Sequence, residues 1–193
     1  MPEPRIAVFL DRDGVINEDR DEYVRSADEL NVFDCVPDAI SRINRAGLRV
    51  FVVSNQQGIA KGLYTWRDLR EMEEKIDRAV RAAGGEISGY YYCPHLAESK
   101  CSCRKPEPGL LLQAAAEHDI RLEGSFMIGD HERDLGAARA AGCRAILVLT
   151  GALAREDVEK LSAGPEFAAD NLGQAADYVI EAVGVDGQPS ADG

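Results

Sequence analysis

The chain has 193 residues, and its 22 Lys and Arg against 34 Asp and Glu give a formal net charge of −12 at pH 7. Nucleic-acid binding depends on clustered positive charge, so this balance argues against a nucleic-acid partner. The length suits a single domain, and 45% hydrophobic with 29% charged residues is typical of a globular protein with a substantial core. An anionic ligand would therefore need a local positive patch or a metal.

The beginning of the chain has no basic segment followed by a long apolar stretch, so we do not expect a signal peptide. No apolar run approaches the length of a membrane span, so we expect no membrane contact and a cytoplasmic protein. The five cysteines are an odd number, and three of them lie within eleven residues. In a reducing compartment, this crowding favours a metal site over a disulfide framework.

Short runs rich in Ile, Val and Phe alternate with segments of helical period, which is typical of an α/β protein with a parallel sheet. The sequence predicts strands at 5–10, 49–54, 88–93, 125–129 and 144–149. It predicts helices at 37–47, 66–84, 108–118, 132–141 and 172–182, the second of them capped by Thr65 with Asp68 three residues on. We expect one domain over residues 1–183 and a flexible tail at 184–193.

In such a sheet ligands bind at the carboxyl ends of the strands. The first strand ends in Asp11 and Asp13, whose carboxylates repel each other unless a cation lies between them. The second ends in Ser54 and three amides (Asn55, Gln56 and Gln57), which are hydrogen-bond donors suited to an oxyanion.

Charged residues follow the third and fourth strands: Arg104 and Lys105, then Asp130, His131 and Asp134. Each element alone has a plain interpretation, as a solvated acidic turn, a helix cap or an exposed basic pair. The occurrence of all four elements in order, each after a predicted strand, instead indicates a Mg²⁺-dependent phosphoryl-transfer site.

The series Asp11-x-Asp13-Gly14, Ser54, Lys105 and Gly129-Asp130 with Asp134 resembles the four motifs of the haloacid dehalogenase superfamily of phosphohydrolases. The resemblance implies a Rossmann-like, doubly wound, mainly parallel sheet and an aspartyl-phosphate intermediate. It implies Asp11 as nucleophile and Asp13 as general acid and base. Ser54 and Lys105 would contact the transferring phosphoryl group. Mg²⁺ would be held by Asp11, the backbone carbonyl of Asp13 and Asp130, with Asp134 in a supporting position.

Only 40 residues separate Asp13 from Ser54, and they must contain one helix and its connections. We therefore expect no cap domain, and an open site shaped by the loops 17–27 and 58–64, the second of which carries Lys61.

The residues Cys93, His95, Cys101 and Cys103 supply three thiolates and one imidazole, which is a closed tetrahedral Zn²⁺ set of the structural type. The alternative is a group of free thiols on a loop. The loop 93–103 is too poor in apolar residues to fold by burial alone, and a metal can supply that energy. Zinc there would fix the two cations that follow it, Arg104 and Lys105.

The runs 91–95 and 103–106, with 54–60 upstream, resemble the D-glycero-D-manno-heptose 1,7-bisphosphate 7-phosphatases, with the histidinol-phosphate phosphatases close behind. The runs 58–62 and 106–109 favour the heptose enzymes, whereas the five residues between His95 and Cys101 match the length in the histidinol-phosphate enzymes. The resemblance implies that Arg104 recognises the phosphate that is not cleaved. The full set of expected substrate contacts is Asp19, Tyr23, Asn55, Gln56, Gln57, Arg104 and His131.

The leading hypothesis is a monomeric phosphatase that removes the 7-phosphate of a heptose bisphosphate in nucleotide-heptose and lipopolysaccharide precursor synthesis. Histidinol-phosphate hydrolysis is the alternative within this class. A receiver-like phospho-acceptor domain would also use acids, a hydroxyl, a lysine and Mg²⁺, but Asp13 could activate water, which argues against a long-lived phospho-aspartate. A zinc-binding interaction module would make Asp11 incidental.

Overall fold

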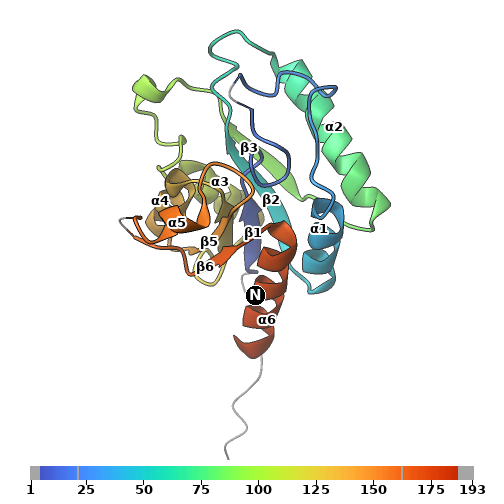
Figure 1. Cartoon of the computed structure of the whole chain (residues 1–193), viewed down its shortest axis with the longest axis vertical. Coiled ribbons are helices and arrows are strands. Elements are labelled where there is room, and N and C mark those ends of the chain that lie inside the picture. The colour runs from blue at the N-terminus through green and yellow to red at the C-terminus, as the bar shows by residue number, and fades with distance from the viewer. Residues whose placement is uncertain (1–4, 21, 162, 187–193) are drawn as a thin grey trace, which may run out of the picture.

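The computed structural model describes residues 5–20, 22–161 and 163–186. Six strands form one sheet in the order β3-β2-β1-β4-β5-β6, and every neighbouring pair is parallel (Figure 1). The strands are β1 (Ala7–Leu10), β2 (Arg49–Asn55), β3 (Gly89–Cys93), β4 (Phe126–Gly129), β5 (Arg144–Val148) and β6 (Phe167–Ala169). The strand order reverses between β1 and β4, so the connections that leave these two strands run to opposite faces of the sheet, and a crevice forms at their carboxyl ends.

Helices cover both faces of the sheet (Figure 1). They are α1 (Val36–Arg45), α2 (Trp66–Ala82), α3 (Gly109–His118), α4 (Glu132–Ala141), α5 (Arg155–Val158) and α6 (Leu172–Asp186), with a short 3₁₀ turn at Ala97–Ser99. Alternate side chains of β1 enter opposite cores: Val8 and Leu10 pack with residues of α1, α2 and α6, whereas Ala7 and Phe9 pack with those of α3 and α4. The doubly wound α/β architecture is confirmed.

Local sequence explains where the helices begin and end. Thr65 and Asp68 form the expected capping box at the start of α2, each side chain bonded to the other residue's backbone N–H. Gly142, at φ +79°, ends α4 in the left-handed region that glycine adopts at no steric cost. The helix predicted at 172–182 continues to Asp186, so residues 184–186 of the expected tail are helical, and 187–193 lie outside the described residues.

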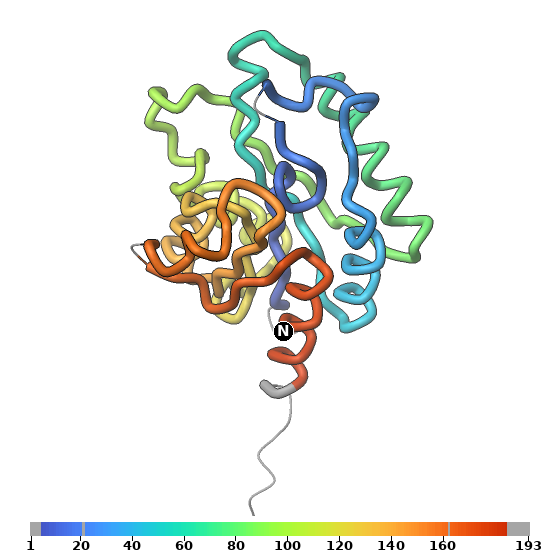
Figure 2. The backbone as a smooth tube through the Cα atoms, in the orientation of Figure 1, coloured from blue at the N-terminus to red at the C-terminus, as the bar shows by residue number. Residues whose placement is uncertain are grey.

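Between β1 and β2 the described residues form α1 and irregular backbone. Three connecting segments, 22–35, 56–65 and 94–108, lie beyond the carboxyl ends of the central strands (Figure 2). Within the described part of the chain, no helix is long and apolar enough to cross a membrane.

Candidate active site

A buried ion-pair cluster forms the base of the site, where β1, β4 and the segment after the cysteine loop meet. The Lys105 Nζ lies 2.9 Å from Asp11 Oδ2 and 2.7 Å from Asp134 Oδ1, and it donates to the Val53 carbonyl at 2.8 Å. Burial lowers the pKa of Lys105, but Asp11 and Asp134 more than offset it, so its pKa lies above the ordinary value. The ammonium therefore stays charged and holds two carboxylates at the strand ends.

Asp130 completes a set of three buried carboxylates. Its Oδ2 accepts from the Ala152 N–H at 2.8 Å, whereas its buried Oδ1 has no hydrogen-bond partner among the described residues. Burial, followed by the charges of Asp11 and Asp134, raises the pKa of Asp130 to about 7. Carboxylate oxygens of these three acids lie within 4.8 Å of one another.

This arrangement fits a hard divalent cation, because Mg²⁺ prefers carboxylate oxygens. Such an ion would offset the repulsion between the three carboxylates and give Asp130 Oδ1 a partner. Glycines on two sides leave room for the Asp130 carboxylate: a Cβ on Gly14 would lie 2.4 Å, and one on Gly151 2.1 Å, from its Oδ2. Asp134, which we expected in a supporting position, offers an oxygen in the same group.

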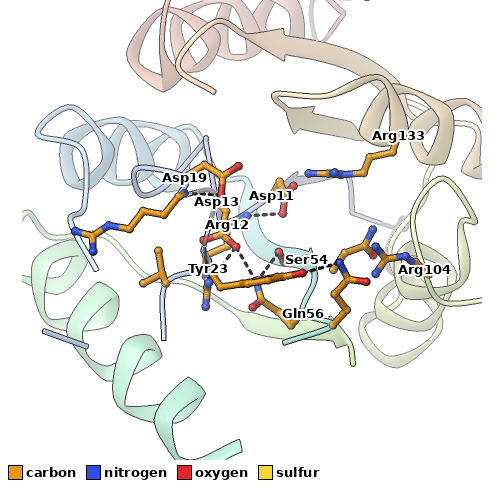
Figure 3. A pocket seen from close by; sticks show the side chains of 13 residues that line it. Asp11, Arg12, Asp13, Asp19, Tyr23, Ser54, Gln56, Arg104 and Arg133 are labelled. Carbon is orange, nitrogen blue, oxygen red and sulfur yellow. Dashed lines mark hydrogen bonds and ion pairs between the residues drawn. The ribbon is translucent and has the colours of Figure 1, made fainter. Parts of the chain in front are cut away.

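Asp13 accepts hydrogen bonds from three side chains, two of which, Arg12 and Gln56, are labelled in Figure 3. Arg12, of which only 1% is exposed, donates from Nη2 to both carboxylate oxygens at 2.8 and 3.0 Å. Asn17 Nδ2 and Gln56 Nε2 each donate at 2.9 Å. The burial of Arg12 and its pairing with Asp13 depend on how the turn after β1 folds.

The polar residues at the carboxyl end of β2 have separate partners. Ser54 Oγ accepts from Gln56 Nε2 at 3.1 Å. The Asn55 side chain accepts from the Lys105 N–H at 3.0 Å and donates to the Lys105 carbonyl at 3.1 Å, so it fixes the backbone that carries the lysine. Gln57 Nε2 donates to the Tyr23 hydroxyl at 2.9 Å, and Lys61 Nζ donates to it at 2.8 Å, so the Lys61 contact joins the two loops expected to shape the entrance.

These side chains surround a cavity of about 240 Å³ (Figure 3). The lining comprises Asp11, Arg12, Asp13, Asp19, Arg20, Tyr23, Val24, Ser54, Asn55, Gln56, Gln57, Arg104 and Arg133. The cavity thus brings together most of the residues expected to act in catalysis or substrate binding. Lys105, Asp130 and His131 are not part of its lining. His131 instead begins α4, where its Nδ1 accepts from the Arg133 N–H at 3.2 Å.

Two arginines that the sequence pattern did not indicate, Arg20 and Arg133, also line this cavity. Arg133 extends from α4 towards Asp11 (Figure 3), and its buried Nε has no hydrogen-bond partner in the described part of the chain. Burial lowers the pKa of Arg133, but the negative charges of Asp134 and Asp11 raise it by more than burial lowers it. The pKa of Arg133 therefore lies above its ordinary value. The sequence signal that could have indicated Arg133 is its position three residues after Asp130, in the first turn of a predicted helix.

The four zinc candidates converge. The Cys103 Sγ lies 3.3 Å from Cys93 Sγ, 3.5 Å from Cys101 Sγ and 3.2 Å from His95 Nδ1, and Cys93 Sγ lies 3.6 Å from both Cys101 Sγ and His95 Nδ1. A Zn²⁺ tetrahedron with bonds of about 2.3 Å to sulfur and 2.0 Å to nitrogen has edges of roughly 3.5–3.8 Å. The donor set and its spacing fit zinc, and all five cysteines are free thiols.

Comparisons with known proteins agree with this site. A family model described as HAD-hydrolase-like matches residues 102–175. A D-glycero-beta-D-manno-heptose-1,7-bisphosphate 7-phosphatase of Neisseria meningitidis is 43% identical over 144 residues, 75% of this chain and 77% of the relative. The corresponding protein of Pseudomonas aeruginosa is 42% identical over 147 residues, covering 76% and 83%.

Among solved structures, a D,D-heptose 1,7-bisphosphate phosphatase from B. bronchiseptica, complexed with magnesium and phosphate, superposes with a TM-score of 0.84. It is 35% identical, and the match covers 91% of this chain and 98% of that one. The fold and the site define a haloacid-dehalogenase-like phosphatase, a hydrolase of phosphoric monoesters. Within that class, the chain belongs to the D-glycero-beta-D-manno-heptose-1,7-bisphosphate 7-phosphatase family. The receiver-like and interaction-module alternatives are thereby set aside.

Proposed function

We propose that the chain removes the 7-phosphate of D-glycero-beta-D-manno-heptose 1,7-bisphosphate, the substrate in the names of its relatives. The observation that carries this proposal is the charge layout of the cavity. The Asp11–Lys105 pair lies at its base. Besides Arg12, which is paired with Asp13, its lining carries the guanidiniums of Arg20, Arg104 and Arg133. A ligand with two phosphates would place one at the base and pair the other with arginine.

The geometry supports a covalent route. Asp11 Oδ1 accepts the Arg12 N–H at 2.7 Å and its Oδ2 pairs with Lys105, so the carboxylate is fixed for attack on phosphorus. The P–O bond to the sugar breaks as the bond to Asp11 forms, and Asp13 gives a proton to the leaving oxygen. Asp13 then takes a proton from the water that hydrolyses the aspartyl phosphate.

Ser54 and Lys105 would contact the oxygens of the transferring phosphoryl group. Asp11, Asp130, Asp134 and the Asp13 carbonyl are the groups available to hold Mg²⁺, which would supply positive charge to the phosphoryl oxygens when bound. Asp19 and Tyr23 would contact the sugar. Arg104, together with Arg133, would contact the phosphate that remains.

The finer properties of the protein complete the proposal. Zinc held by the cysteine cluster would be structural, because four protein ligands leave no open position. Five free thiols suit a reducing cytoplasm, and we expect a monomer acting on a small phosphorylated metabolite. Residues 1–183 would form one catalytic domain.

Phosphate release from the heptose bisphosphate with Mg²⁺ tests the proposal, and phosphorus NMR of the product identifies the phosphate removed. Asp11→Asn should lower kcat by at least about a thousand-fold, because the nucleophile is lost. Asp157→Asn, which alters an exposed ion pair with Lys160, is the matched control and should leave turnover unchanged. Survival of turnover in Asp11→Asn would exclude the aspartyl-phosphate route.

Histidinol phosphate is the comparison substrate. It carries one phosphate and cationic groups, which Arg20, Arg104 and Arg133 of the cavity lining would repel, so its kcat/KM should be lower by about a hundred-fold or more. Equal or faster turnover of histidinol phosphate would overturn the substrate assignment and leave the phosphatase class intact.

A further inference from the structure

The Gln56 side chain lies at the centre of a hydrogen-bond network of fixed direction. It is 2% exposed, and its Nε2 donates to Asp13 Oδ2 at 2.9 Å and to Ser54 Oγ at 3.1 Å. The Tyr64 hydroxyl donates to its Oε1. Because a carboxylate can only accept, the amino end of the amide must face Asp13, and the carbonyl end must face Tyr64.

This direction determines what the Ser54 hydroxyl can do. A hydroxyl has one proton to donate, and Ser54 uses its oxygen to accept from Gln56. Within the described residues the Ser54 proton is given to no protein group, and Ser54 lines the cavity. The proton is therefore left for a ligand oxygen in the cavity.

We propose that Tyr64 is a positioning residue that acts through Gln56 to keep the Ser54 hydroxyl a donor to the transferring phosphoryl group. The inference rests on the proposed function, since it needs a phosphoryl group beside Ser54. The chain of donors runs from Tyr64 O–H to the Gln56 carbonyl, and from the Gln56 amino group to Ser54, whose own proton faces the cavity.

Tyr64 holds the Gln56 amide in this orientation from its carbonyl end. A half-turn of the amide would present its carbonyl to Ser54, which would then donate to Gln56 and lose its bond to the phosphoryl group. Tyr64 opposes this change, because the turned amide would leave the buried hydroxyl without an acceptor.

Two further observations show that the Tyr64 position is built for this contact. The side chain is 5% exposed, and burial raises the pKa of Tyr64 to about 12, so the hydroxyl keeps its proton at neutral pH. A Cβ on Gly58 would lie 2.1 Å from Tyr64 Cε1, so only glycine at position 58 leaves space for the ring.

The test is a double-mutant cycle in the Zn²⁺- and Mg²⁺-loaded protein, with heptose bisphosphate as substrate. Tyr64→Phe should lower kcat roughly three- to ten-fold, as expected for one hydrogen bond, with KM changed less than about two-fold. In the Ser54→Ala background the same change should cost less than about two-fold, because the group through which Tyr64 acts is already gone. Equal costs in both backgrounds, or no cost in either, would overturn the inference.

Tyr90→Phe is the matched control, since it removes a hydroxyl that donates to Asp77 on α2 and leaves the cavity lining unchanged. It should leave kcat within about two-fold of wild type. If Tyr64→Phe fails to fold, Gly58→Ala replaces it and should show the same dependence on Ser54. The Asp11→Asn variant tests the phosphatase route separately. If Asp11→Asn loses activity as expected, and the effects of Tyr64→Phe and Ser54→Ala on kcat are additive, only the role of Tyr64 is refuted.

Discussion

Replacing Lys105 with Met removes a buried cation that pairs with Asp11 and Asp134, while keeping the length of the side chain. The Lys105 side chain is 1% exposed, and those of Asp11 and Asp134 are 4% and 0% exposed, so water cannot screen the charges left behind. Removing one partner of a buried pair costs about 3–5 kcal/mol of unfolding free energy. For a chain of this size, that corresponds to a fall of roughly 6–20 °C in Tm.

The assay is thermal unfolding in Mg²⁺-free buffer, repeated with saturating Mg²⁺. Lys160→Met is the control: Lys160 pairs with Asp157 at 2.8 Å, but the two side chains are 70% and 38% exposed, and the expected change is below about 1 kcal/mol. Mg²⁺ should stabilise Lys105→Met more than wild type, because the ammonium no longer competes for the same carboxylates. Equal losses for the two lysine variants, or a smaller Mg²⁺ gain in Lys105→Met, would refute this account of the cluster.

Three further predictions concern the metals and the cavity. In Mg²⁺-free buffer, wild type should lose stability as pH rises from about 4 to about 7, because native Asp130, with its raised pKa, keeps a proton that the unfolded chain releases. Asp130→Asn should lack this slope, and an equal slope would contradict the assignment. Zinc removal by a chelator should open the loop 94–104 to protease and lower kcat by roughly ten-fold, measured after exchange into Mg²⁺ buffer. Arg133→Ala should raise KM for the bisphosphate by about ten-fold, whereas Arg139→Ala, on the exposed side of α4, should not.

The sequence predicted the central sheet well, because its strands are continuous apolar runs between turn residues. The five predicted strands match β1–β5 with ends displaced by at most two residues. β6, with the sequence Phe-Ala-Ala, and α5 were missed because three or four residues are too few to show a period. α6 runs past its predicted end at 182 and continues through Gly184 to Asp186, because a single glycine weakens a helix without ending it.

The candidate site was predicted as a set of residue types, whereas the contacts between them required the fold. Strand ends placed Asp11, Ser54 and Asp130 at one edge of the sheet, as the pattern indicated. The bond between Asn55 and the Lys105 backbone joins residues 50 positions apart, and nothing local predicts it. The same is true of Tyr64, which was treated as the end of a loop and in fact contacts Gln56 from within the core.

The contact of Asn55 with both backbone groups of Lys105 has a consequence for how the protein tolerates damage. Two separate contacts fix the position of Lys105. One is the cysteine cluster, which ends at Cys103, and the other is the side-chain amide of Asn55 on β2. Two independent constraints on one residue form a redundant restraint, so loosening either alone should displace the ammonium only partly. Oxidation of one cysteine would then lower the rate of the enzyme without abolishing it. The side chain of Asn55 would still hold the backbone of Lys105 at the strand ends.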